Sequence, residues 1–140
     1  MSEQLPVITL WQPWATWVMA GWKTIETRTH PRFACLVGQR IGIHAGLHWD
    51  QDAIRLAQPY LTNEQVDVTK KYLRIGGGII GTVKVTMHRE LHAEDSPAAL
   101  INCEHTRRWG LFLVEPRIIE AIPVRGKQGI WIYKATAVDE

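Results

Sequence analysis

Short apolar runs, separated by polar and turn-forming residues, predict a series of strands and short helices. The segments that read as strands or extended chain are residues 7–10, 23–28, 40–46, 79–87, 110–114 and 129–135. Helical patterns fall between several of these strands. Strands interleaved with helices in a small domain predict an α+β fold, a small β-barrel of about 5–6 strands with flanking short helices.

The first predicted helix lies within residues 12–21. Pro13 suits the first helical turn, and Gly21 suits the C-terminal cap. Trp14 and Trp17 stand at helical spacing, so both rings lie on one face of a helix of about two turns.

Two further helices are predicted in the middle of the chain. Asp50 starts the first of them, and it stops before Pro59. The second covers residues 62–73 and begins with Thr62, with Gln65 three positions later. This spacing is the pattern of a capping box, in which the two residues satisfy backbone N–H groups of the first helical turn.

The composition is that of an ordinary folded protein, and the length suits one domain over residues 1–140. Hydrophobic residues make up 46% and charged residues 21%, which excludes a disordered chain. The net charge is +2. Such a weak positive charge permits a nucleic-acid partner without requiring one, because nucleic-acid-binding domains usually carry a denser basic stripe.

The expected compartment is the cytoplasm, and no membrane partner is expected. The first ten residues lack a basic segment followed by a long apolar core, so they do not form a signal peptide. No apolar run approaches the roughly 20 residues of a membrane helix. Cys35 and Cys103 form no closely spaced pair, which favours a reducing environment. Cys35 lies in an apolar run and is expected in the core.

The glycine-rich segments do not have the pattern of a nucleotide triphosphate site. Residues 76–78 are three glycines, and residues 125–129 contain Gly-Lys, but a strand follows each segment where a phosphate loop needs a helix. Both segments are therefore interpreted as tight turns that lead into strands.

No metal and no cofactor are expected. His88, His92, Cys103 and His105 could supply ligands, but their spacing matches neither a zinc finger nor a zinc protease motif. They are interpreted as scattered histidines and a lone thiol.

The segment around residue 26 carries the strongest sign of chemistry. In an extended segment Thr24, Glu26 and Arg28 point to one face, with Lys23 at the preceding corner. A lysine beside a carboxylate can transfer protons, because each group and its burial shift the other's pKa. The alternative is a surface salt bridge, worth about 0 to 1 kcal/mol.

These motifs resemble the opening signature of the ASCH domain family, a branch of the PUA-like fold. The matching residues are Gln12, Pro13, Trp14, Ala15, Gly21, Lys23, Glu26 and Arg28. Residues 41–46, 77–85 and 123–131 resemble later family segments in the same order, so the likeness covers nearly the whole chain. The pattern is most similar to ASCH proteins with glutamate at position 26, such as the EOLA-type.

The resemblance implies a cleft beside the signature that binds RNA or a nucleotide. A related bacterial branch removes the acetyl group from N4-acetylcytidine with a lysine, a threonine three residues later and a distant glutamate. Lys23 matches the lysine, whereas Glu26 stands at the threonine position and departs from that set. Thr24 and Thr27 flank this position, and Thr24 is kept as a catalytic candidate.

The distant glutamate cannot be aligned by motif. Glu104 is the first candidate for this catalytic role, followed by Glu90 and Glu94.

The resemblance also implies a set of substrate contacts, with Trp14 as a stacking platform for the base and Gln12 as a hydrogen-bond partner of a pyrimidine edge. The residues expected to bind the substrate are Gln12, Pro13, Trp14, Arg28, His44, Arg125, Lys127 and Gln128. Two alternatives stay open: His44 could be a buried, satisfied histidine, and the residues from Arg125 to Gln128 could form a solvated turn.

Two classes of function follow. The first is an amidohydrolase that cleaves the exocyclic amide of N4-acylated cytidine or cytosine, with a small nucleoside as its partner. The alternative is a non-catalytic module for single-stranded RNA or a modified nucleotide, and a metal-independent ribonuclease ranks third. A monomer or weak dimer is expected.

Overall fold

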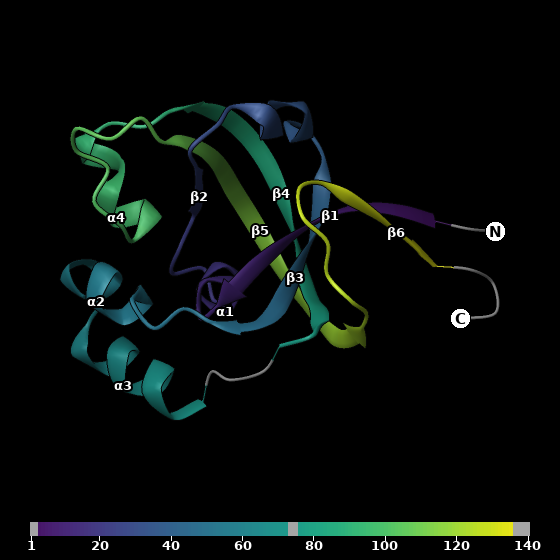
Figure 1. Ribbon diagram of the computed structural model, residues 1–140, viewed down its shortest axis with the longest axis horizontal. Helices are drawn as coiled ribbons and strands as arrows, with labels where there is room; N and C mark the ends of the chain where they lie inside the picture. Colours follow the sequence, from purple (N-terminus) through teal and green to yellow (C-terminus); the bar gives the residue numbers. More distant parts are fainter. Residues whose placement is uncertain (1–2, 73–75, 136–140) are drawn as a thin grey trace.

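A computed structural model describes residues 3–72 and 76–135, which form a strongly curved six-stranded sheet with short helices (Figure 1). The strand order is β2-β5-β4-β3-β1-β6. The strands are β1 (Glu3–Gln12), β2 (Ile25–Arg28), β3 (Arg40–Trp49), β4 (Gly78–Glu90), β5 (Trp109–Pro123) and β6 (Trp131–Ala135). The α+β class and the predicted number of strands are confirmed.

The sheet is open at its two edges. β1 and β3 are parallel, whereas the other neighbouring strands are antiparallel. Within the described residues, edge strands β2 and β6 do not pair with each other, so the sheet curves without closing into the predicted barrel. Irregular registers in the β3–β4 and β4–β5 pairs accompany this curvature.

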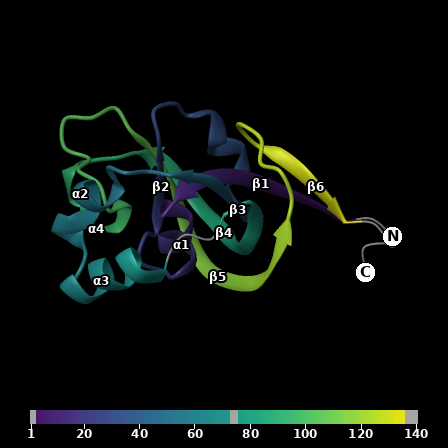
Figure 2. The ribbon, with the colours of Figure 1, turned by 60° about the horizontal axis from the view of Figure 1, so that its bottom comes forward.

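Helices gather at one end of the sheet, and β6 lies at the other end (Figures 1 and 2). The helices are α1 (Trp14–Met19), α2 (Ala53–Ala57), α3 (Asn63–Tyr72) and α4 (Ser96–Ala99). Short 3₁₀ segments occupy Arg32–Leu36, Gln58–Tyr60 and Ala93–Asp95. The first of these buries Phe33 and Leu36 and leaves Cys35 exposed, so the expectation of a core Cys35 is wrong.

Helix α1 follows its predicted boundaries closely. Pro13 directly precedes the helix, and Gly21 lies just beyond it with a φ of +80°. A left-handed residue at this position favours glycine, because other side chains crowd their own backbone there.

Helix α2 is shorter than predicted. It starts after Asp52, and the chain continues through Pro59 as a 3₁₀ turn. Asp50 lies before the helix, where its Oδ1 accepts the N–H of Asp52 at 3.0 Å. Asp50 therefore shapes the approach to α2 and leaves its second carboxylate oxygen for another contact.

Helix α3 has the predicted capping box. The N–H of Gln65 donates to Thr62 Oγ1 at 3.0 Å, and the N–H of Thr62 donates to Gln65 Oε1 at 2.9 Å. The helix is described to Tyr72, and the predicted last residue, Leu73, lies outside the described residues.

Replacing Thr62 by alanine is expected to lower the free energy of unfolding by about 1 kcal/mol, because the N–H of Gln65 loses its acceptor. Urea unfolding followed by circular dichroism measures the change. Asn63→Ala, at the exposed first residue of α3, is the matched control and should stay closer to wild type. Equal losses in the two variants would show that the missing Thr62 hydroxyl is not the cause, and helix propensity cannot be the cause either because alanine is the best helix former.

Trp17 joins α1 to the other helices. Its side chain is fully buried, and it packs with Ala53, Ala57 and Leu100. The indole N–H donates to Thr69 Oγ1 on α3 at 2.9 Å. Trp17 is therefore a core residue, and it fixes α1 against α2 and α3.

Candidate active site

A hollow of about 430 Å³ lies beside α1 and β2, and we call it the Lys23 hollow. It is lined by Thr9, Leu10, Trp11, Trp14, Lys23, Glu26, Thr27, Arg28, Asp50, Leu56, Ile101 and Arg108. The corner between α1 and β2 sets its floor, because the carbonyl of Trp17 accepts the N–H groups of Trp22 and Lys23 at 3.0 and 3.1 Å.

Lys23 is the most deeply buried charged group in this hollow, with 2% of its surface exposed. Its Nζ donates to the carbonyl oxygen of Ala99 and lies 4.0 Å from Glu26 Oε1. It also lies 5.0 Å from the centre of the Trp14 ring. The ammonium therefore contacts an acceptor, a carboxylate and an aromatic ring in one place.

Burial lowers the pKa of Lys23 from 10.5 to about 8. Glu26 and Cys103 oppose this change by raising the pKa, while Arg108 and Arg28 contribute to the lowering. A lysine with this pKa has both its charged and its neutral form available near neutral pH, which suits proton transfer.

Glu26 is buried and lies between two cations. Its Oε2 is 3.2 Å from Nη2 of Arg28, and its Oε1 faces Lys23. Glu26 and Arg28 are alternate residues of β2, paired with Leu111 and Trp109 of β5. The group is not an exposed surface salt bridge, because the carboxylate and the ammonium are both buried.

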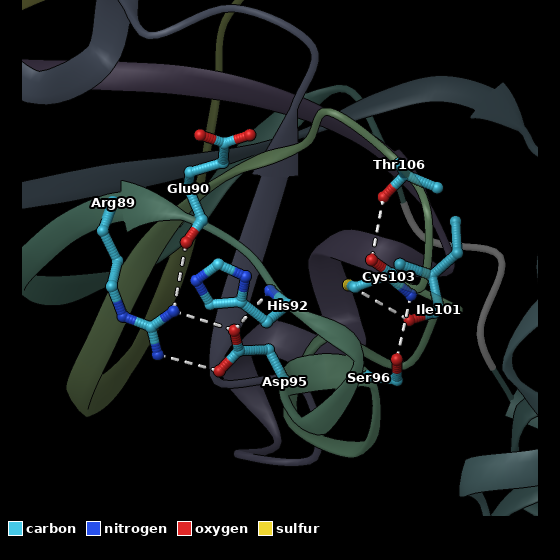
Figure 3. Close-up of polar contacts among 8 residues, drawn as sticks. All are labelled: Arg89, Glu90, His92, Asp95, Ser96, Ile101, Cys103 and Thr106. Atoms are coloured by element: carbon cyan, nitrogen blue, oxygen red, sulfur yellow. Dashed lines mark hydrogen bonds and ion pairs between the residues drawn. The ribbon is translucent and has the colours of Figure 1, made fainter.

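The segment before α4 is held by a bidentate ion pair (Figure 3). Arg89 Nη1 and Nη2 donate to the two carboxylate oxygens of Asp95 at 2.8 and 2.9 Å, and Asp95 Oδ2 also accepts the N–H of His92 at 2.9 Å. The hydrogen bond from Arg89 holds the pKa of Asp95 below its usual range. This arrangement joins the end of β4 to the start of α4.

The first residue of α4 makes a second contact in the same view (Figure 3). Ser96 Oγ accepts the N–H of Cys103 at 2.9 Å. Ala99, the last residue of α4, lies between these two positions and supplies the carbonyl that accepts from Lys23. The α4 segment therefore positions the Lys23 ammonium through the carbonyl of Ala99.

Asp50 is a site residue that sequence reasoning missed. It lines the Lys23 hollow, and its Oδ2 accepts the indole N–H of Trp14 at 2.8 Å. The sequence signal was present, because Asp50 directly follows β3, but it was interpreted as a helix start. Asp50 fixes the Trp14 ring and is the second carboxylate of the hollow.

The structure does not bring Thr24 or Glu104 into this hollow. Thr24 is exposed and joins the sheet through its backbone, whereas Thr27 lines the hollow. Glu104 is exposed and pairs with His105 at 3.2 Å. Glu90 and Glu94 are likewise exposed.

Gln12 and Pro13 are buried and are not among the lining residues. Gln12 Oε1 accepts the N–H and the hydroxyl of Thr16 at 3.0 and 2.9 Å. This oxygen therefore stabilises the first turn of α1, which is a different role from the predicted contact with a pyrimidine edge.

The remaining predicted contacts line a second, larger hollow of about 1080 Å³, which we call the basic hollow. His44, Arg125, Lys127 and Gln128 lie here and not in the Lys23 hollow. The two hollows adjoin, because Thr9, Trp11 and Arg28 line both of them. The predicted site residues are thus divided between two connected spaces.

His44 is buried at the base of the basic hollow, with 2% of its surface exposed. Its Nε2 donates to the carbonyl of Val124 at 2.7 Å. A Cβ at position 126 would lie 2.7 Å from Nδ1 and 2.8 Å from Thr9 Oγ1. Glycine at this position therefore lets the 124–129 loop approach the histidine.

No group of three metal-ligating side chains is found in residues 3–72 and 76–135. His88 stacks on Trp109 with ring centres 5.4 Å apart, and His105 faces Glu104. The same part of the chain contains no helix long and apolar enough to cross a membrane.

The fold resembles that of ASCH from Zymomonas mobilis, with a TM-score of 0.53 and 17% sequence identity over 84% of this chain and 72% of that chain. Two single-substitution variants of that protein also match, each at 17% identity. The Tyr to Phe variant has a TM-score of 0.52, and the match covers 84% of this chain and 74% of that chain. The Ser to Ala variant has a TM-score of 0.53, and the match covers 85% of this chain and 73% of that chain. No family model and no curated protein matches the sequence. The chain therefore has the ASCH fold, as the opening signature predicted.

Proposed function

We propose that the protein hydrolyses the exocyclic amide of an N4-acylated cytosine base, releasing the amine and a carboxylic acid. The observation that carries this proposal is the buried lysine with a pKa of about 8, set 4.0 Å from a buried glutamate. A lysine with a lowered pKa beside a carboxylate, in a hollow of ligand size, is typical of a site for proton transfer. The ASCH fold supports the comparison with N4-acetylcytidine hydrolysis but does not define a substrate.

The two groups divide the chemistry of amide hydrolysis. Glu26 takes a proton from water, and the water oxygen forms a bond to the acyl carbon. The Lys23 ammonium stabilises the resulting oxyanion, and one of its three N–H groups is already directed to Ala99. When the C–N bond breaks, Lys23 protonates the leaving nitrogen, and the proton held by Glu26 restores the ammonium.

Trp14 supplies the wall on which a base can stack. Its half-buried ring is held by Asp50 and makes an edge contact with Trp17, with ring centres 5.0 Å apart. Stacking of a base on an aromatic ring contributes about 1–3 kcal/mol. Because Lys23 lies near the same ring, a stacked cytosine would place its exocyclic amide beside the lysine.

The direct test is incubation of the purified protein with N4-acetylcytidine, without added metal, while the ultraviolet spectrum is followed as cytidine forms. Turnover in proportion to protein concentration is the expected result. If neither N4-acetylcytidine nor longer N4-acyl analogues are hydrolysed, the amidohydrolase proposal fails.

The basic hollow favours a second candidate, a binding module for single-stranded RNA. Its lining contains several cations and no carboxylate among the described residues. Binding without chemistry predicts an affinity for short RNA that falls with added salt, because cations on the protein displace the counterions of the phosphates. The exposed Trp11 at the rim offers a further stacking surface.

The rate of N4-acetylcytidine hydrolysis is expected to fall above pH about 8, by about tenfold per pH unit. Lys23 acts in its protonated form, and its lowered pKa means that this form is lost as the pH rises through that value. Measuring kcat/KM from pH 6 to 10 checks this. In Lys23→Arg, the remaining activity should no longer fall near pH 8. If the fall in rate above pH 8 were unchanged in this variant, it would be caused by another group.

A further inference from the structure

The two connected hollows differ sharply in charge. The Lys23 hollow contains two carboxylates, Glu26 and Asp50, beside its cations. The lining of the basic hollow contains no aspartate or glutamate among the described residues. It contains three arginines and one lysine, Arg28, Arg32, Arg125 and Lys127. A concave surface of one charge sign concentrates ligands of the opposite sign. The larger space is therefore built for an anion.

Three of these cations have no acidic partner in the part of the chain that the structure describes. Arg32, Arg125 and Lys127 are exposed, and none forms an ion pair within residues 3–72 and 76–135. Lys127 Nζ lies 5.9 Å from the centre of the Trp131 ring. The pKa of His30 in the same lining is lowered, by burial first and then by Arg32 and Arg28. Arg32 and Arg28 thus act on His30 within the lining of the hollow.

The loop that carries Arg125 and Lys127 is fixed to the sheet. The carbonyl of Val124 accepts from His44 Nε2, and the N–H of Val124 donates to the carbonyl of Gly77 at 3.3 Å. Its glycine at position 126 packs directly against His44. An anion bound here would meet side chains on an anchored loop, which lowers the cost of ordering them.

The boundary between the hollows lets one ligand occupy both. Thr9, Trp11 and Arg28 line each space. Arg28 binds Glu26 through Nη2 and also faces the basic hollow. Trp11 is 53% exposed at this boundary. A base beside Trp14 could therefore continue past Trp11 into the cationic space.

We propose that the substrate is a phosphorylated nucleotide: an N4-acylated cytidine whose base occupies the Lys23 hollow and whose phosphate is bound by Arg125 and Lys127. This inference rests on the proposed function, and it narrows the substrate from nucleoside to nucleotide. The phosphate takes no part in the reaction, so hydrolysis of the amide leaves it intact. The same phosphate chemistry is present in a free nucleotide and in a nucleotide within an RNA strand.

The kinetic test compares kcat/KM for N4-acetylcytidine 5′-monophosphate with that for N4-acetylcytidine. The nucleotide is expected to be favoured by about tenfold at low salt and by less as salt is added. The double variant Arg125→Ala/Lys127→Ala should lose most of this preference. The control Lys70→Ala/Lys84→Ala removes the same charge from exposed positions outside both hollows and should keep it. Equal kcat/KM for the two substrates, or equal losses in both double variants, would overturn the proposal.

A binding test separates this inference from the proposed function. Titration calorimetry with cytidine 5′-monophosphate, cytidine and an RNA of five cytidines needs no turnover. Tighter binding of the nucleotide than of cytidine, reduced by Arg125→Ala/Lys127→Ala, supports the phosphate site even if no amide is hydrolysed. Tighter binding of the RNA than of the nucleotide would identify the strand as the source of the phosphate. If cytidine and its monophosphate bind equally, the phosphate site is refuted even if hydrolysis is observed.

Discussion

The variant Lys23→Met is expected to hydrolyse N4-acetylcytidine about 100- to 1,000-fold more slowly than the wild type, or not measurably. Methionine fills a similar space but cannot stabilise an oxyanion or protonate a leaving amine. Arg28 does not replace it, because its guanidinium is bound to Glu26. Single-turnover rates with saturating substrate measure the loss in the chemical step.

The same variant separates loss of chemistry from loss of folding. Because the folded-state pKa of Lys23 lies below 10.5, the unfolded chain binds more protons between pH about 8 and 10.5. Wild-type stability should therefore rise through this window, and Lys23→Met should lack the rise. At pH 7 the variant should be at least as stable as the wild type, since a charge is no longer buried. A folded variant with near-wild-type turnover would exclude Lys23 from the mechanism.

The variant Glu26→Gln is expected to lose about 100- to 10,000-fold in turnover, because an amide cannot accept the proton of the attacking water. The side chain keeps its shape, and its carbonyl oxygen can still face Lys23 or Arg28. Steady-state rates of N4-acetylcytidine hydrolysis, measured from pH 6 to 10, test this expectation. The activity that remains should no longer depend on deprotonation of residue 26.

Glu104→Gln is the matched control for this variant. Glu104 is exposed and, among the described residues, forms an ion pair with His105 outside the Lys23 hollow, so its loss should leave turnover close to wild type. A large loss in Glu104→Gln together with an active Glu26→Gln would reverse the assignment. The catalytic carboxylate would then be the one that the family resemblance suggested.

The parts of the site that could be predicted from the sequence are local in the chain. Pro13 and Gly21 mark the ends of α1, and the corner after it follows from their spacing. The alternation along β2 then places Glu26 and Arg28 on one face. These features depend on backbone geometry over a few residues, so the sequence pattern contains them.

The parts that could not be predicted depend on long-range contacts. The carbonyl that accepts a hydrogen bond from Lys23 belongs to Ala99, the last residue of α4. This helix has four residues, which is too short for the sequence to show a helical periodicity. The contact of Asp50 with Trp14 spans 36 residues. β5 continues to Pro123, well beyond its predicted end at Val114, because its mostly exposed second half still pairs with β4. Glu104 was chosen without a motif that aligns it, and a position along the chain does not determine a position in space.

The pairing of β1 with β6 has a consequence for how the protein is made. Residues 3–7 of β1 pair with residues 131–135 of β6, while Thr9 accepts a hydrogen bond from Trp131 at 3.1 Å. Contacts of such wide sequence separation form slowly, because a long loop must close first. During synthesis, the edge of β1 that pairs with β6 stays unpaired until residue 135 has left the ribosome. Until then its edge is open to pairing with other chains, so aggregation of nascent protein should be most severe in chains that end before β6.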